Sequence, residues 1–302
     1  MDVLVSEPAF FGGNVLDEGS VSGITLIMSI DKLVVWKGDL SIDIKSQPEN
    51  YNWTLPQKES ATMHVGIITY QTGHLKTWQL LTKLRMKSFK VSLFAFPFKH
   101  RPSKHTPHFQ DRPHQLINLD IKRFCHENGI QWVEMEGWRA HHTAGLGDPL
   151  DQNSPDVFLT CIAKIIPKCF LNNRIILNAH PGILPQNRGL DAFKWAVIRP
   201  QTLGITLHVI DEYIDRGTII HRVKVPVFQE DTLKDVAHRG YEMECDLQAN
   251  FEHHLCRVKD GLTVGDKFPL SRMRIPMEMD QRIEEIFERN KKKLIELSKG
   301  EL

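Results

Sequence analysis

Short apolar runs alternate with longer amphipathic stretches through the middle of the chain. A run at 64–69 is followed by apolar residues at helical spacing over 75–86, and a second run follows at 90–96. Two buried strands joined by an amphipathic helix are typical of a βαβ unit, so this pattern predicts the start of a parallel sheet. The remaining pattern predicts strands at 131–135, 156–162, 174–177, 204–210 and 219–227, and helices over 118–128, 190–198 and 232–258.

The two ends of the chain differ from this middle part. Residues 1–46 hold short apolar runs punctuated by glycines and acids, which predicts a small β-rich N-terminal extension. A proline-containing polar linker is expected over 47–62, and a helical C-terminal tail over 261–302, with one amphipathic helix over 276–297. The predicted fold class is therefore α/β: a Rossmann-like, mostly parallel sheet with flanking helices over 63–260, joined to these two appendages.

Charge and cysteine content narrow the function classes. Lys and Arg number 38 against 37 Asp and Glu, so no overall field attracts nucleic acid or a membrane surface. We find no apolar run of membrane-spanning length and no secretory signal pattern, and the 5 cysteines lack Cys-x-x-Cys spacing. These features predict a cytoplasmic protein with neither nucleic acid nor membrane as a partner. The first βαβ unit has no Gly-x-Gly-x-x-Gly, which argues against a dinucleotide cofactor.

Polar side chains capable of acyl-transfer chemistry stand at the ends of two predicted strands. Asn178 and His180 are two residues apart, so on an extended segment they face the same way, and Asp215 follows the next strand. An imidazole can move protons, an amide can donate to a developing oxyanion, and a carboxylate can orient or charge the imidazole. The alternative from the residues alone is a loop held together by side-chain hydrogen bonds.

The two segments that carry these residues resemble the signature of the folate-dependent formyltransferases. The first is Asn-Ala-His-Pro-Gly-Ile-Leu-Pro-Gln-Asn-Arg-Gly at 178–189, and the second runs from Gly204 through Thr206, His208, Asp211 and Asp215 to Ile220. That family includes glycinamide ribonucleotide, methionyl-tRNA and sugar N-formyltransferases.

The resemblance implies the formyltransferase fold and transfer of a formyl group from 10-formyltetrahydrofolate to a primary amine, without a metal. It implies catalytic roles for Asn178 and His180 at the formyl oxygen, and for Asp215 beside His180. It also places the folate against two turns, with cofactor-binding residues Lys164, Ile165, Ile166, Ile210, Asp211, Glu212 and Tyr213. Ile165 and Ile166 can equally belong to the core.

The acceptor is less directly indicated. The segment 97–114 is basic and broken by prolines, so Lys99 and Arg101, together with Arg188, are candidate ligands for an anionic acceptor. The alternative for the segment is a solvated loop. The residues after Glu230 are mostly helical in pattern and not strongly basic, unlike the tRNA-binding domain of methionyl-tRNA formyltransferases. We therefore expect an amino sugar, either nucleotide-linked or of the pseudaminic type. Another small amine, or a chain that binds folate without turnover, is the alternative, and a homodimer is left open.

Overall fold

A computed structural model of the chain describes residues 25–29, 32–36, 63–98, 106–137, 155–171, 174–258, 261–263, 271–300 and 302. Its contacts divide the chain into two units, Met1–Asp39 and Leu40–Leu302. In the first unit, strands β1 (Thr25–Ser29) and β2 (Lys32–Trp36) pair antiparallel as a hairpin. This hairpin lies within the predicted β-rich extension. The domain boundaries at 46, 62 and 260 stay a prediction.

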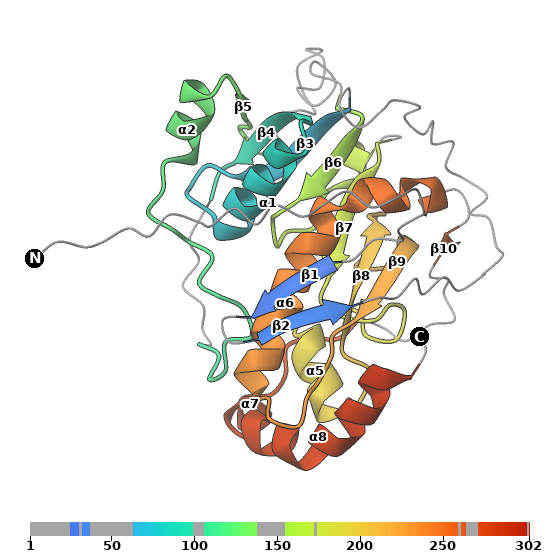
Figure 1. The fold of residues 1–302 in the computed structure, drawn as a ribbon. Helices are drawn as coiled ribbons and strands as arrows, with labels where there is room; N and C mark the ends of the chain where they lie inside the picture. Colours follow the sequence, from blue (N-terminus) through green and yellow to red (C-terminus); the bar gives the residue numbers. More distant parts are fainter. Residues whose placement is uncertain are drawn as a thin grey trace, which may run out of the picture. The chain divides into compact units, whose positions relative to one another are not determined.

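The second unit is built on an eight-stranded sheet of order β10-β9-β8-β7-β6-β3-β4-β5 (Figure 1). The five strands from β7 to β5 are parallel, whereas β8, β9 and β10 run antiparallel to their neighbours. The predicted α/β fold class is confirmed, with the refinement that one edge of the sheet is antiparallel. The strands are β3 (His64–Tyr70), β4 (Lys90–Phe96), β5 (Gln131–Glu134), β6 (Val157–Thr160), β7 (Ile176–His180), β8 (Gly204–Val209), β9 (Thr218–Lys224) and β10 (Leu262–Thr263).

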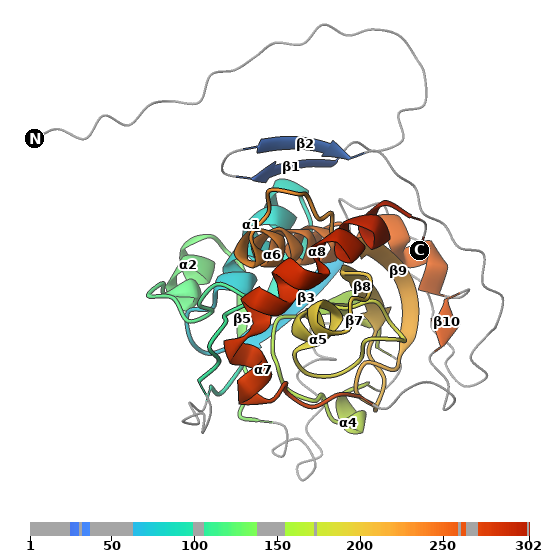
Figure 2. The same cartoon turned by 90° about the horizontal axis from the view of Figure 1, so that it is seen from below.

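Burial on both faces explains why the parallel strands are continuous apolar runs in the sequence. Every residue of β3 is buried, as expected for a parallel strand covered on both faces. On one face, α1 (Leu75–Met86) and α6 (Leu233–Ala249) lie side by side, and α6 packs on β7 and β8 (Figure 2). The other described helices in this part of the chain are α2 (Ile121–Glu127), α4 (Lys168–Leu171) and α5 (Ala192–Ile198).

Two predicted helices are interrupted in the structure. The helix expected over 232–258 ends at Ala249 and continues as the 3-10 helix η3 (Phe251–Val258). Lys87, which follows α1, donates to the carbonyl of Ala249 at 2.9 Å and to Oδ1 of Asn250 at 2.6 Å, so a distant lysine caps this helix end. The helix expected over 276–297 is two helices, α7 (Met277–Gln281) and α8 (Ile283–Lys299), which divide at Arg282.

A buried ion pair attaches this C-terminal pair of helices to α5. Lys194 Nζ lies 2.7 Å from Asp280 Oδ1, and the two side chains are 2% and 1% exposed. Lys194 also donates to the carbonyl of Phe109, and Asp280 accepts from the backbone N–H of His108. The pair therefore joins α5 and α7 to the basic segment 97–114 at His108 and Phe109. Figure 1 shows α5, α7 and α8 gathered at one end of the second unit.

The Lys194–Asp280 pair predicts a large stability effect. Asp280→Ala leaves a buried lysine without its counter-charge, so we expect a loss of about 3 kcal/mol or more in the free energy of unfolding, measured by urea denaturation. Glu285→Ala is the matched control in the same helices, because it breaks the exposed Arg282–Glu285 pair, whose side chains are each 61% exposed. That control should cost far less, because exposed ion pairs contribute little to stability. Equal losses in the two variants would contradict the assignment.

Candidate active site

The pairing of β7 with β8 places four polar side chains on one face of the sheet. In this antiparallel register Asn178 lies opposite His208 and His180 lies opposite Thr206. Directly opposed residues share a face, and alternate residues of one strand do too. Accordingly Asn178 Nδ2 lies 3.2 Å from His208 Nε2, and the rings of His180 and His208 meet edge to face with centroids 6.4 Å apart.

Asp215 reaches this group from the loop between β8 and β9. Its Oδ2 lies 3.5 Å from Nδ1 of His180, and its Oδ1 lies 3.9 Å from Nε2 of His208. The backbone N–H of Gly189 donates to Oδ2 at 2.9 Å. Asp215 has a φ of 47°, in the left-handed region that aspartate and asparagine tolerate better than most residues. The structure thus brings together the three residues predicted to be catalytic.

His180 is held between two oxygen acceptors. Its Nε2 donates to the backbone carbonyl of Asn187 at 2.8 Å, while its Nδ1 faces Asp215. The side chain is buried, so these two contacts fix the orientation of the ring.

His208 is a site residue that the sequence analysis quoted in the motif and assigned no role. Burial lowers its pKa from 6.5 to about 4, although the charge of Asp215 opposes this and that of His180 adds to it. Its Nδ1 donates to the carbonyl of Val209 at 3.2 Å, so Nε2 is the acceptor of the Asn178 amide hydrogen. His208 is thus a neutral ring that orients Asn178. The alternation of Thr206 and His208 along β8 was the available signal.

Asp215 stays ionised in this setting. Burial by itself raises its pKa, but His180, His208, the Gly189 N–H and Arg188 together hold the pKa below its ordinary value of 3.8. Because His208 is neutral above about pH 4, the groups that stabilise the Asp215 carboxylate at neutral pH are His180, the Gly189 N–H and Arg188. The site therefore combines a fixed carboxylate with the imidazole of His180.

The three residues predicted to bind the acceptor have different outcomes. Lys99 and Arg101 lie outside the described residues. Arg188 is buried, and its Nη2 and Nε donate to the carbonyl of Ile214 at 2.7 and 3.2 Å. The guanidinium therefore holds the loop next to Asp215, and its contact with an acceptor stays a prediction.

The first of the two predicted folate turns offers one exposed side chain. Ile165 is 66% exposed, whereas Ile166 is buried in the core cluster that includes Phe96 and Phe170. Lys164 donates to the carbonyl of Pro97 at 3.4 Å and lies over the ring of Tyr70. Of these two isoleucines, only Ile165 presents an apolar side chain to a ligand.

The second predicted folate turn lies beside the first. Lys168 Nζ and Glu212 Oε2 are 2.8 Å apart, which joins the end of the first turn to the second. Ile210 packs against the same core cluster as Ile166, and Asp211 Oδ1 accepts from the N–H of Tyr213 at 2.9 Å. Burial raises the pKa of Asp211. Tyr213 is 50% exposed, so the two turns together present apolar side chains around polar groups.

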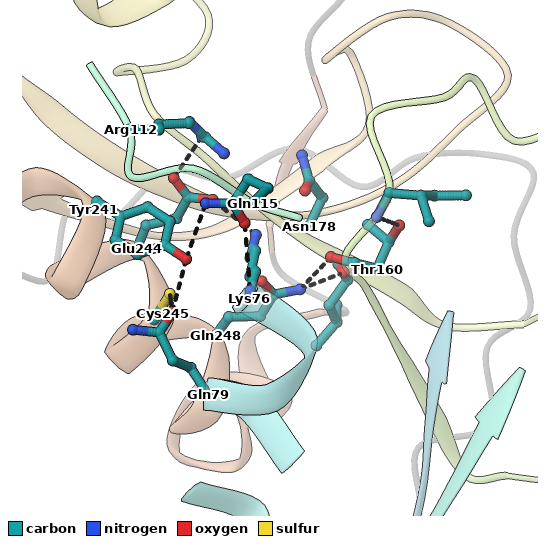
Figure 3. A network of polar contacts seen from close by, with 12 residues as sticks. Lys76, Gln79, Arg112, Gln115, Thr160, Asn178, Tyr241, Glu244, Cys245 and Gln248 are labelled. Carbon is teal, nitrogen blue, oxygen red and sulfur yellow. Dashed lines mark hydrogen bonds and ion pairs between the residues drawn. The ribbon is translucent and has the colours of Figure 1, made fainter. Parts of the chain in front are cut away.

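A charged network that the sequence analysis did not predict joins Lys76 of α1 to Glu244 of α6, with Arg112 beside them (Figure 3). Glu244 binds Lys76 at 2.7 Å and Arg112 at 2.6 Å, and both cations hold its pKa below the ordinary value against the effect of burial. Arg112 and Glu244 also line a small cavity bordered by Pro181, the residue after His180. Helical periodicity gave no indication that Lys76 on α1 and Glu244 on α6 point inward.

Two further properties concern the described residues only. Their His, Cys, Asp and Glu side chains form no group of three or more arranged to hold a metal ion. Among the helices in the part of the chain that the structure describes, none is long and apolar enough to cross a membrane.

Comparisons with known proteins find a matching family and several similar proteins. Residues 121–249 match the family described as formyl transferase. A phosphoribosylglycinamide formyltransferase of Haemophilus influenzae is 34% identical over 129 residues, covering 40% of this chain and 61% of that protein. A dTDP-4-amino-4,6-dideoxyglucose formyltransferase of Mycobacterium bovis is 30% identical over 95 residues, covering 32% and 39%. A 4-N formyltransferase structure from Francisella tularensis is 18% identical, with 77% and 88% covered and a TM-score of 0.48.

The fold and the site define an α/β protein in which an imidazole, an amide and a carboxylate meet at the β7–β8 pairing. Residues 121–249 match the formyl transferase family, so the resemblance predicted from the two signature segments is confirmed. The chain spans less than two-thirds of the length of both curated relatives.

The neutral burial of His208 predicts a pH dependence of stability. The unfolded chain binds a proton at His208 below about pH 6.5, whereas the folded protein resists it down to about pH 4. The unfolding free energy should therefore fall as pH drops through this window, with His208 contributing up to about 1.4 kcal/mol per pH unit. Urea denaturation between pH 7 and 5 should show a smaller slope for His208→Gln. His238→Gln removes an exposed histidine as a control and should keep the wild-type slope; a wild-type slope in His208→Gln would contradict the prediction.

Proposed function

We propose that this protein is an N-formyltransferase that moves the formyl group of 10-formyltetrahydrofolate to a primary amine. We propose further that this amine belongs to an amino sugar. The observation that carries the proposal is the group formed by His180, Asp215 and Asn178 inside a formyl transferase domain. An imidazole beside a fixed carboxylate, with an amide on the same strand face, is suited to transfer of an acyl group between nitrogens.

The chemistry assigns a role to each residue. The neutral amine attacks the formyl carbon, negative charge develops on the formyl oxygen, and the bond from carbon to the folate N10 then breaks. Asn178 donates one amide hydrogen to His208 and has a second available for the formyl oxygen. The imidazole of His180, on the same strand face as Asn178, is the second group assigned to the formyl oxygen. Asp215 fixes His180 and helps pass the amine proton to N10.

The residues around the two turns fit a flat folate ring. Ile165, Tyr213 and Ile214 present exposed apolar surface, and polar groups at Asp211 and Glu212 stand beside them. Binding sites for such ligands are mostly apolar with a few polar groups that set orientation. The donor-binding residues predicted from sequence therefore remain part of the proposal.

The acceptor is the finer part of the proposal. One relative is named for a dTDP-linked 4-amino-4,6-dideoxy sugar and another for phosphoribosylglycinamide, so both amines belong in the test. The purified protein should be mixed with 10-formyltetrahydrofolate and each candidate, with tetrahydrofolate release followed by absorbance. Turnover with an amino sugar supports the proposal. Turnover with glycinamide ribonucleotide alone would replace the acceptor, and folate binding without any turnover would favour a non-catalytic role.

Substitutions at the site test the mechanism. His180→Ala and Asp215→Asn should each lower kcat by about 10²-fold, because one removes the imidazole and the other the carboxylate charge. Asparagine tolerates the left-handed backbone at position 215, so the second variant keeps the loop conformation. The control is Cys256→Ser, which changes an exposed residue on η3 and should turn over normally. Near-normal kcat in either site variant would remove that residue from the mechanism.

A further inference from the structure

The segment 271–275, here called the C-terminal strap, lies against the loop that carries the end of the first signature segment. Arg272 donates its N–H to the carbonyl of Arg188 at 3.0 Å, and its own carbonyl accepts from Leu190 at 2.9 Å. Gly189 and Arg272 thus form a parallel β-bridge. The strap is distant in sequence from the signature and has no counterpart in the predicted motif.

The approach between the strap and Gly189 requires glycine. A Cβ at Gly189 would collide with the backbone N and O of Arg272, and the φ of 94° at Gly189 is one that other residues rarely adopt. The same glycine donates its N–H to Asp215 Oδ2. One residue therefore contacts the strap on one side and the proposed catalytic carboxylate on the other.

Side chains of α5 and its N-terminal end fix the strap in place. Asp191 Oδ2 accepts from the N–H of Ile275 at 3.1 Å, and Trp195 Nε1 donates to the carbonyl of Met273 at 2.8 Å. Ile275 is buried, and the strap leads directly into α7, which the Lys194–Asp280 pair anchors. The strap is thus fixed by α5 and by α7, so the segment that contacts Gly189 is itself held in place.

We propose that the C-terminal strap positions Asp215 against His180 by fixing Gly189, so that Asp191 and Trp195 are positioning residues for the reaction. The inference rests on the proposed function for its kinetic consequence. Its physical basis is that a carboxylate on a loop holds its place only where its hydrogen-bond donors are themselves fixed. The helical tail is in this view part of the catalytic unit.

The kinetic test uses substitutions that loosen the strap without touching Gly189 or Asp215. Asp191→Gly removes the acceptor of the Ile275 N–H and allows the φ of 52° found at this position, and Trp195→Phe removes the indole donor. The double variant should lower kcat about tenfold and leave both KM values within about twofold, because geometry at the reacting centre changes while binding does not. The single variant Asp191→Asn keeps a side-chain acceptor for the Ile275 N–H, so it should keep most of the wild-type kcat.

A matched control separates positioning from general loss of stability. Asn290 on α8 donates to the carbonyl of Val197 at 2.9 Å, so Asn290→Ala also breaks a hydrogen bond between the C-terminal helices and α5, away from the strap. Its kcat should stay at the wild-type value. Equal losses of kcat in Asn290→Ala and in the double variant would overturn the proposal.

A second measurement does not depend on turnover. Carbon-13 NMR titration of the Asp215 carboxyl should show its pKa rising towards the ordinary value in the double variant, because the carboxylate loses the Gly189 donor, and staying low in Asn290→Ala. His180 from β7, His208 from β8 and Arg188 are the other charged or titratable groups that hold this pKa, and all three are kept in every variant. An unchanged pKa in the double variant overturns the strap proposal even if the wild-type protein transfers no formyl group, so the two proposals fail separately.

Discussion

The antiparallel pairing of β7 with β8 is the constraint on which the site depends. It is the point where the parallel half of the sheet gives way to the antiparallel edge. The register sets Asn178 opposite His208, and the two-residue repeat of the strand puts His180 on the same face. A shift of one residue would turn Asn178 and His180 to the other face, so the site and the register of the sheet are a single feature.

The site combines two histidines with opposite characters a short distance apart. His180 faces oxygen atoms at both ring nitrogens, whereas His208 is buried, neutral and aligned with the amide of Asn178. The carboxylate of Asp215 lies between them. The neutral ring of His208 orients the amide of Asn178, while the ring of His180 faces the carboxylate of Asp215.

Around this group, segments distant in sequence hold each other in place. The loop that carries Asp215 is bonded to Arg188 and Gly189, and Gly189 is bridged to the C-terminal strap. The strap leads into α7, which a buried ion pair joins to α5. An ion pair between Lys168 and Glu212 also joins the two turns predicted to bind folate. The core also contains the buried ion pairs Lys76–Glu244 and Lys194–Asp280. Each pair joins two different helices, so each is satisfied only in this arrangement of the helices.

The sequence by itself determined the α/β class, the approximate positions of most described elements of the second unit, and the segments that carry Asn178, His180 and Asp215. These follow from local rules, since apolar periodicity and turn residues act over a few neighbours. The tertiary structure decided what no local pattern contains. The inward charges of Lys76 and Glu244, the neutrality of His208 and the end of α6 at Ala249 depend on partners far away in the chain. Burial and cross-strand register are properties of the folded molecule, so residues such as His208 acquire their chemistry only when the sheet has formed.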